Sequence, residues 1–310
     1  MRTVCRRFNL IEELGQIKYV FSDKTGTLTQ NIMVFKNIIL KNGTVVSYDS
    51  DTSKLKQESK DSYEKMLLWI CVCHSIMIDE NNEYQASSPD ELALLNYAKT
   101  KGYIFKNRTP NKIFVQVPDK VLSFDILSNF EFDSARQRMT VILRENFDRN
   151  RTLAISKGSD TVIPSKDPKI ELILSKLAKT GLRILSFGER EITDPYELDM
   201  IKQTDTSVRK SIECRISKVN ERELLMRQIE NKSFDFIGAT AIEDKLQDQA
   251  SDTLKTLHKA DIKIWVLTGD KVETAESISR SCELIAEKDF CFTGLDLEKN
   301  LHVMLLANKI

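Results

Sequence analysis

The sequence predicts an α/β protein of about two domains. Its 310 residues are more than a single domain usually contains. A short β-prone run at 19–22 ends in Asp23, and a near-continuous apolar run at 262–267 ends in Thr268. Between them, residues 103–158 are rich in alternating, strand-like segments. Strands that end in polar residues are typical of α/β folds, in which ligands bind at the carboxyl ends of strands.

The composition is that of a globular protein able to bury a core, with 41% hydrophobic and 30% charged residues. Lys plus Arg and Asp plus Glu each total 46, so the net charge is zero and nothing supports nucleic-acid binding. No stretch approaches the roughly 20 apolar residues that span a bilayer. The six cysteines lack the spacing of a disulfide framework, so free thiols are expected.

The run 71–74 (CVCH) holds three potential metal ligands. Its spacing is not that of a zinc site, and no second ligand pair follows it. It lies at the end of the apolar stretch 66–73, and cysteine is among the most often buried residues. We therefore expect these side chains in the core.

The segment 23–29 (DKTGTLT) carries the strongest chemical signal. A carboxylate is ionised at neutral pH, so Asp23 can attack a phosphoryl group without a general base once a cation neutralises the phosphate. Gly26 allows a tight turn, and Thr25 and Thr27 offer hydroxyls and amides to phosphate or Mg²⁺.

This segment resembles the phosphorylation motif of the P-type ATPases, which are ion and lipid pumps that pass through an aspartyl-phosphate. Residues 9–16 and the pair Gln30-Asn31 are similar to one subclass, the type IV phospholipid flippases. The resemblance implies that ATP is the substrate and that Mg²⁺ is held by Asp23 and the Thr25 carbonyl. It implies catalytic roles for Asp23, Lys24 and Thr25.

Two further phrases resemble the nucleotide-binding domain of that family. Segment 84–91 (YQASSPDE) implies that Glu91 approaches ATP, although it also reads as a capping sequence for a helix over 92–101. Segment 130–139 (FEFDSARQRM) implies that Phe132 stacks on adenine, worth roughly 1–3 kcal/mol, with Ser134 beside it. Strand alternation predicts that Phe130 lies in the core. Gln137 stands where the family usually has Lys.

Three shorter matches complete the resemblance. Segment 157–160 (KGSD) implies that Lys157 lies in the adenosine pocket, where Gly158 permits close approach. In segment 181–185 (GLRIL), Arg183 would hold phosphate oxygens, although it also reads as a surface arginine after a helix-ending glycine. A strand that ends in a hydroxyl before a helix is a phosphate site. The phosphoryl group is therefore expected to meet Thr268, Gly269 and Asp270 before a helix over 272–285.

The resemblance also implies the domain organisation. A haloacid-dehalogenase-like, Rossmannoid phosphorylation domain is expected over 1–36 and 233–310, with an inserted α+β nucleotide-binding domain over 37–232. Within these, 194–232 is expected to form solvated helices, and 234–244 to begin a βαβ unit. Asp23 and Thr268 should lie at adjacent strand ends. The family's later G-D-G-x-N-D phrase, its actuator domain and its membrane helices are not found, so we expect the chain to be a fragment.

The leading hypothesis is therefore the cytosolic catalytic segment of a phospholipid-translocating P-type ATPase, at the cytosolic face of a membrane. It would bind Mg-ATP and form an aspartyl-phosphate at Asp23 that drives lipid flipping in the full-length pump. Phospholipid would be moved by membrane helices outside this chain, and the family admits a small membrane-spanning accessory subunit. One alternative is a truncated, non-catalytic nucleotide-binding remnant. Another is a soluble phosphatase of the same fold, in which a general-acid Asp would stand at the position of Thr25.

Overall fold

A computed structural model of the chain describes residues 9–86, 88–146, 151–206, 214–268, 279–280, 282 and 284–285. The chain divides into two compact units. The first comprises Met1–Ile32, Ala178–Leu182 and Asp244–Ile310, and the second comprises Met33–Leu177 and Arg183–Glu243. Two of the boundaries fall inside long strands, after Ile32 in β2 (Thr29–Leu40) and after Glu243 in β12 (Asp235–Leu246).

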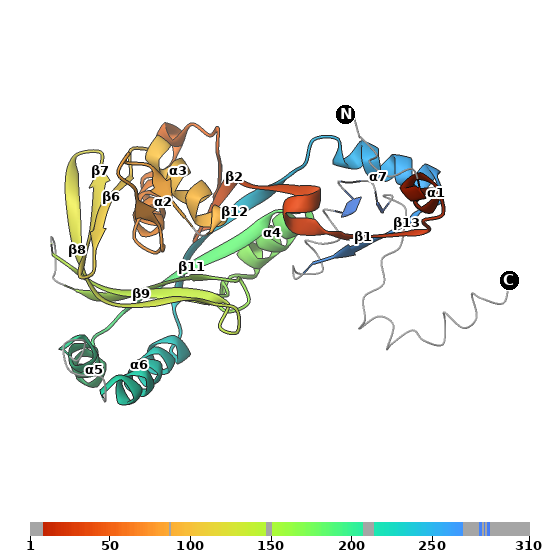
Figure 1. Cartoon of the computed structure of the whole chain (residues 1–310). Coiled ribbons are helices and arrows are strands. Elements are labelled where there is room, and N and C mark those ends of the chain that lie inside the picture. The colour runs from red at the N-terminus through yellow and green to blue at the C-terminus, as the bar shows by residue number, and fades with distance from the viewer. Residues whose placement is uncertain are drawn as a thin grey trace, which may run out of the picture. The chain divides into compact units, whose positions relative to one another are not determined.

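The second unit is built on a nine-stranded sheet with the order β3-β2-β12-β11-β10-β9-β8-β7-β6 (Figure 1). Strands β6 to β11 each pair antiparallel with the next strand in sequence. In chain order the strands are β2 (Thr29–Leu40), β3 (Val45–Ser47), β6 (Ile104–Thr109), β7 (Lys112–Val117), β8 (Lys120–Asp133), β9 (Arg138–Glu145), β10 (Thr152–Gly158), β11 (Arg183–Glu191) and β12 (Asp235–Leu246).

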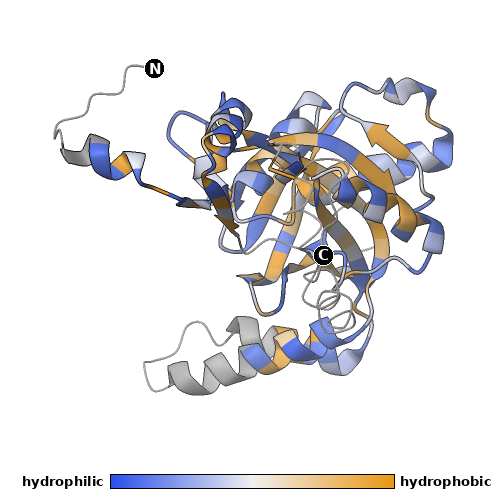
Figure 2. Cartoon of the chain, turned by 90° about the vertical axis from the view of Figure 1, so that its right-hand side faces the viewer, coloured by the Kyte–Doolittle hydropathy of each residue, from blue (hydrophilic) through white to orange (hydrophobic). Residues whose placement is uncertain are grey.

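Helices cover both faces of this sheet (Figure 1). On one face lie α2 (Gln57–Ile70) and α3 (Pro89–Thr100), and on the other α5 (Pro195–Thr206) and α6 (Cys214–Asn231). Helix α4 (Pro168–Lys179) precedes β11, and β4 (Met77–Ile78) pairs with β5 (Tyr84–Gln85). Figure 2 shows the hydrophobic residues concentrated in the strands.

The central strands are buried because side chains of both faces enter a core. Val141 and Leu143 of β9 lie in the larger core with α2 and α3, whereas Ile142 between them lies in the smaller core with α5 and α6. All seven residues of β10 are buried. Each fully buried aliphatic side chain contributes about 1.5–3 kcal/mol, so this strand anchors both layers.

The first unit contains a two-stranded parallel sheet of β1 (Tyr19–Asp23) and β13 (Lys263–Leu267). Helices α1 (Asn9–Gly15) and α7 (Ala250–Lys259) belong to the same unit. Leu28 and Leu254 form its small core with Cys282. The register runs from Tyr19 opposite Lys263 to Asp23 opposite Leu267, so both strands end at the same edge.

Two expectations about the second half of the chain need correction. The helices expected within 194–232 are present as α5 and α6, but they are not only solvated, because Ile201 of α5 and Leu225 and Ile229 of α6 are buried against the sheet. Residues 234–244 do not begin a βαβ unit beside β13, because β12 pairs antiparallel with β11 in the nine-stranded sheet. Both errors have one cause, since a local pattern does not reveal which distant strand or sheet face a segment meets.

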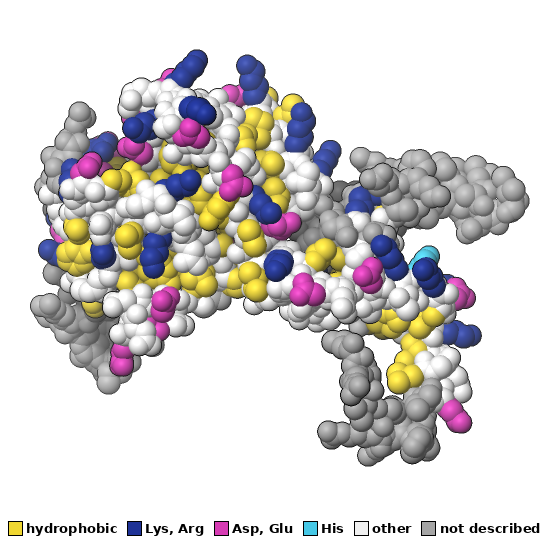
Figure 3. Space-filling model, turned by 90° about the horizontal axis from the view of Figure 1, so that it is seen from above, with side chains coloured by type: hydrophobic (Ala, Val, Ile, Leu, Met, Phe, Trp, Pro, Cys, Tyr) yellow, Lys and Arg dark blue, Asp and Glu magenta, His cyan; other side chains and the backbone are white. Residues whose placement is uncertain are grey.

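Helix α2 covers Gln57–Ile70 and ends before the CVCH run. Residues Cys71 and Val72 turn the chain, and Met77–Ile78 form a short strand. No helix in the described ranges is both long and apolar enough to cross a membrane. Figure 3 shows basic and acidic side chains interspersed on the face viewed from above, in keeping with the zero net charge.

Packing of α6 is testable with two neighbouring leucines. Leu225→Ala should lower the free energy of unfolding by about 2–5 kcal/mol, because Leu225 is fully buried and its removal leaves a cavity. The adjacent Leu224 is 50% exposed, so Leu224→Ala should change stability by no more than about 0.5 kcal/mol. Urea unfolding of the two variants measures the difference. Equal effects would mean that α6 does not pack on the sheet.

Candidate functional site

Neighbouring strands of the second unit bring most of the predicted nucleotide contacts to one end of the sheet. Asp133 at the end of β8 pairs with Arg138 at the start of β9, which pairs with Gly158 at the end of β10. Gly158 pairs with Ser186 of β11, and β11 begins at Arg183 on the same side. The predicted residues Phe132, Ser134, Lys157 and Arg183 therefore lie at or next to the same end of adjacent strands.

Lys157 and Glu91 form a buried ion pair. The Lys157 Nζ lies 2.6 Å from Glu91 Oε1 and donates to the carbonyl of Cys73 at 2.9 Å. Glu91 Oε2 accepts hydrogen bonds from the backbone N and the Oγ of Ser75, at 2.9 and 2.7 Å. Glu91 lies in the first turn of α3, where the helix dipole favours a carboxylate. Lys157 and Glu91, which the sequence predicts from two separate motifs, are thus paired with each other.

Burial and the ion pair act on Glu91 in opposite directions. Burial alone would raise its pKa, but the charge and hydrogen bond of Lys157, with the bonds from Ser75, lower the pKa to about 2. Glu91 therefore stays ionised and neutralises Lys157 locally. Lys157 consequently offers a fixed position and its remaining N–H donor to a ligand, rather than a free positive charge.

The CVCH run lies beside this pair as part of the core. His74 packs edge-on against Phe105 at 4.4 Å, its Nδ1 accepts from the backbone N of Ile76, and its carbonyl accepts from Arg108. Burial, with the Lys157 charge adding to it, lowers the pKa of His74 to about 3. Burial raises the pKa of the Cys73 thiol to about 11. The expectation of a core position is confirmed, and within the described ranges no three potential metal ligands cluster.

The first turn of α3 also contacts Arg183, the other basic residue that the sequence predicts at the nucleotide site. Arg183 Nη1 donates to Asp90 Oδ2 at 2.7 Å, with both side chains partly exposed. Asp90 belongs to the predicted capping sequence, and its contact with Arg183 does not follow from that local pattern. Ser88, at the N-cap position, makes no side-chain capping bond. The adjacent carboxylates Asp90 and Glu91 therefore each hold one of the predicted nucleotide contacts.

Phe132 is the second-to-last residue of β8, and Ser134 begins the turn that connects β8 to β9. Phe130 is buried as predicted, whereas Phe132 is 64% exposed, so its ring is accessible to a stacking partner. Ser134 is exposed in the following turn. The β8–β9 register shifts between Phe130 and Asp133, which interrupts the regular alternation of the strand. Phe130 is therefore buried although Phe132, two residues later, is exposed.

Gly158 allows the backbone of the β8–β9 turn, rather than a ligand, to approach it closely. A Cβ at this position would lie 2.4 Å from the Gln137 carbonyl oxygen and 2.6 Å from the Arg138 Cβ. The backbone N of Ser159 donates to the same Gln137 carbonyl at 3.0 Å. Glycine is therefore needed so that the β8–β9 turn can lie against the end of β10.

In the first unit, Asp23 and Lys24 point to different environments. Asp23 is exposed at the end of β1 and its Oδ1 accepts from the backbone N of Lys24 at 2.7 Å. The Lys24 side chain is buried, with Nζ 2.9 Å from Asp244 Oδ2. Among the described residues, Asp244 Oδ1 has no hydrogen-bond partner. Asp244, which none of the motifs above singles out, is therefore a further residue of this site.

The expected meeting of two strand ends is confirmed. Asp23 pairs with Leu267 across the parallel sheet, and Thr268 follows directly and is exposed. Thr25 is exposed in the turn after Asp23, where Gly26 has φ +79°. Gly269, Asp270 and most of the expected helix over 272–285 lie outside the described residues.

The buried pair and its histidine neighbour predict how stability depends on pH. His74 has a pKa of about 3 when folded against 6.5 unfolded, so the unfolded chain takes up a proton first and stability falls below about pH 6.5. Glu91 has a pKa of about 2 against 4.5, so its contribution is lost as pH falls from about 4.5 towards 2. Urea unfolding at a series of pH values measures both.

Each pH region has its own variant. His74→Asn keeps an acceptor for the Ile76 N–H and should flatten the pH dependence between about 6.5 and 4.5. Glu91→Gln should lower stability at pH 7, because it leaves Lys157 buried without its counter-charge. It should also reduce the slope below about pH 4.5, where the His74 contribution still continues to about pH 3. A wild-type slope between 6.5 and 4.5 in His74→Asn would show that this imidazole is not held neutral.

Comparison with known proteins agrees with this geometry. A family model described as P-type ATPase, cytoplasmic domain N, matches residues 62–166, the range that contains Glu91, Phe132 and Lys157. Phospholipid-transporting ATPase IC of Xenopus tropicalis is 37% identical over 344 aligned residues, covering 97% of this chain and 26% of that protein. The Homo sapiens protein of the same name is 35% identical, covering 97% and 27%.

A third relative, Phospholipid-transporting ATPase FetA of Mus musculus, is 36% identical over 358 aligned residues, covering 100% of this chain and 29% of that protein. The chain thus spans about a quarter of the length of these relatives. The similarity extends over nearly all of the chain, well beyond the range of the family model. On these findings the chain belongs to the P-type ATPases, and its relatives are phospholipid-transporting members of that family.

Proposed function

We propose that this chain is the nucleotide-binding and phosphorylation segment of a phospholipid-translocating P-type ATPase, and that it binds Mg-ATP and accepts the γ-phosphoryl group on Asp23. The observation that carries the proposal is the parallel pairing of β1 with β13, which ends the two strands at Asp23 and Leu267. An exposed carboxylate and the Thr268 hydroxyl then share one sheet edge. Such an edge suits phosphoryl transfer, which depends mainly on positioning and charge.

Nucleotide recognition would use the nucleotide-binding domain expected over residues 37–232, most of which lies in the second unit. Phe132 would stack on adenine, with Ser134 and Lys157 near the adenosine and Glu91 fixing the lysine. Arg183 would donate to phosphate oxygens once it is released from Asp90. The exposed ring of Phe132 and the ordered Lys157–Glu91 pair support these roles.

Phosphorylation would use the haloacid-dehalogenase-like domain assigned to 1–36 and 233–310. The donor set fits Mg²⁺, because the Asp23 carboxylate and the Thr25 carbonyl are the hard oxygen ligands that this ion prefers. When bound, Mg²⁺ would neutralise phosphate charge. Asp23 would act as the nucleophile, and Thr268, Gly269 and Asp270 would contact the phosphoryl group. Lys24 would hold the turn through its bond to Asp244.

The remaining roles come from the relatives. Their names describe phospholipid transport, so we propose that phosphorylation of Asp23 drives lipid translocation by membrane helices of a longer protein, with this segment on the cytosolic face and a small accessory subunit as a partner. A phosphatase reading is disfavoured because Thr25 stands where a general-acid Asp would be needed to hydrolyse the phosphoenzyme.

Transfer of radiolabel from [γ-³²P]ATP tests the proposal. Asp23→Asn should reduce acid-stable, hydroxylamine-sensitive label on the protein by at least about 100-fold, because the amide cannot act as the nucleophile. Asp252→Asn is the matched control, since Asp252 is an exposed carboxylate of α7 in the same unit and should leave labelling unchanged. Undiminished label in Asp23→Asn would refute the assignment. Nucleotide binding without any label on Asp23 would instead favour the non-catalytic remnant.

A further inference from the structure

We infer that Glu230, near the end of α6, is a positioning residue for nucleotide binding, because it holds the turn that presents Phe132. The inference rests on the proposed function, in which Phe132 stacks on adenine. Glu230 lies about a hundred residues from that turn in the sequence and belongs to no motif discussed above. Its role follows from a network of contacts on the face of the sheet that α5 and α6 cover.

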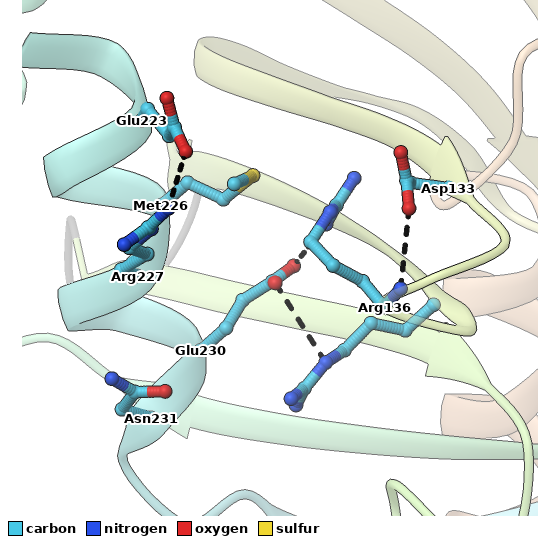
Figure 4. Close-up of a pocket in the computed structure, with 8 residues that line it drawn as sticks. Asp133, Arg136, Glu223, Met226, Arg227, Glu230 and Asn231 are labelled. Carbon is cyan, nitrogen blue, oxygen red and sulfur yellow. Dashed lines mark hydrogen bonds and ion pairs between the residues drawn. The ribbon is translucent and has the colours of Figure 1, made fainter. Parts of the chain in front are cut away.

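Glu230 is a buried carboxylate that gathers groups from β9 and the turn before it (Figure 4). Its Oε1 accepts from Arg136 Nη1 at 2.8 Å and from Thr140 Oγ1 at 2.7 Å. Its Oε2 lies 3.7 Å from Arg138 Nε. One anionic group on α6 therefore fixes three side chains of the β8–β9 hairpin.

Arg136 carries this restraint to the backbone beside Phe132. While Nη1 meets Glu230, Nη2 donates to the carbonyl of Glu131, the residue immediately before Phe132. Asp133, immediately after Phe132, accepts from the backbone N of Arg136 through its Oδ1. Because the Phe132 ring is largely exposed, its orientation depends on this backbone rather than on close packing of the ring.

The same carboxylate also reaches the strand that carries Lys157. Thr140 Oγ1 lies 3.0 Å from Ser156 Oγ, and Ser156 directly precedes Lys157 on β10. Successive strand residues face opposite sides of a sheet, so Ser156 faces α6 while Lys157 faces Glu91. Glu230 is thus connected to both predicted contacts of the adenosine.

A cavity of about 330 Å³ adjoins this network, lined by Asp133, Arg136, Arg138, Glu223, Met226, Arg227, Glu230 and Asn231. Since side chains leave this space unfilled, few dispersion contacts hold the turn there, and the polar network holds it instead. Figure 4 shows Arg136 directed at Glu230, and Arg227 paired with Glu223 at the outer side. Three acidic and three basic side chains line the cavity, so their formal charges balance.

Binding of ATP to a set of variants of the full chain, measured by isothermal titration calorimetry, tests the inference. Phe132→Ala should weaken binding about tenfold through loss of stacking. Glu230→Gln keeps the side-chain size but removes the charge, and should weaken binding about three- to tenfold. Arg136→Met should have the same effect and serves as the second variant if Glu230→Gln folds poorly.

The double variant Phe132→Ala with Glu230→Gln separates positioning from a general effect. If Glu230 acts through Phe132, the double variant should bind ATP about as weakly as Phe132→Ala alone, because the ring that is positioned has been removed. Full additivity of the two losses would overturn the inference. Wild-type affinity in both Glu230→Gln and Arg136→Met would also overturn it, while loss of binding in Phe132→Ala would leave the proposed function standing.

Glu197→Gln is the matched control. Glu197 is an equally buried carboxylate on α5, the neighbouring helix, and it pairs with Arg190 at 2.9 Å rather than with the β8–β9 turn. This variant should lower the midpoint of thermal unfolding yet leave the ATP dissociation constant unchanged. A loss of affinity in Glu197→Gln equal to that in Glu230→Gln would reduce the role of Glu230 to stability and overturn the inference. Failure of the wild-type chain to bind ATP would overturn both this inference and the proposed nucleotide binding.

Discussion

A lysine and a glutamate that are both removed from water must compensate each other's charge, and the buried pair Lys157–Glu91 does so in the larger unit. Desolvating two charges costs several kcal/mol each, and only good geometry with further hydrogen bonds offsets that cost. Ser75 and the Cys73 carbonyl supply those bonds. The first turn of α3 is thereby connected to the end of β10, where adjacent strands present the other proposed nucleotide contacts. The position of α3 therefore determines the arrangement of the proposed site.

The two compact units divide the proposed chemistry. The larger unit supplies an exposed aromatic ring, a fixed lysine and an arginine, which are groups for binding. The smaller unit supplies an exposed carboxylate and a hydroxyl at one sheet edge, which are groups for accepting a phosphoryl group. In each unit an ion pair holds the backbone next to a proposed functional residue. Lys24 pairs with Asp244 beside Asp23, and Arg136 pairs with Glu230 in the turn that follows Phe132.

Local patterns predicted what depends on local sequence. Alternation of apolar and polar residues, together with turn-forming residues between segments, predicted three features. These are the strand ends at Asp23 and Thr268, the hairpin strands of 103–158 and the burial of Phe130. Partners far apart in sequence could not be foreseen in this way. Asp90 meets Arg183 across 93 positions, Glu230 meets Arg136 across 94, and Asp244 meets Lys24 across 220. From sequence alone, each of these acidic residues is interpreted as a helix cap or as part of a solvated face. Only the tertiary fold shows which basic side chain it pairs with.

The chain has two tryptophans, and each compact unit contains one of them. Trp69 of α2 is buried and donates its indole N–H to Glu189, whereas Trp265 of β13 is 56% exposed beside Phe21. A buried indole emits at shorter wavelength than a solvated one, so the two contributions to intrinsic fluorescence are spectrally distinct. The protein thus carries one optical reporter for the larger compact unit and another for the strand pair that ends at Asp23.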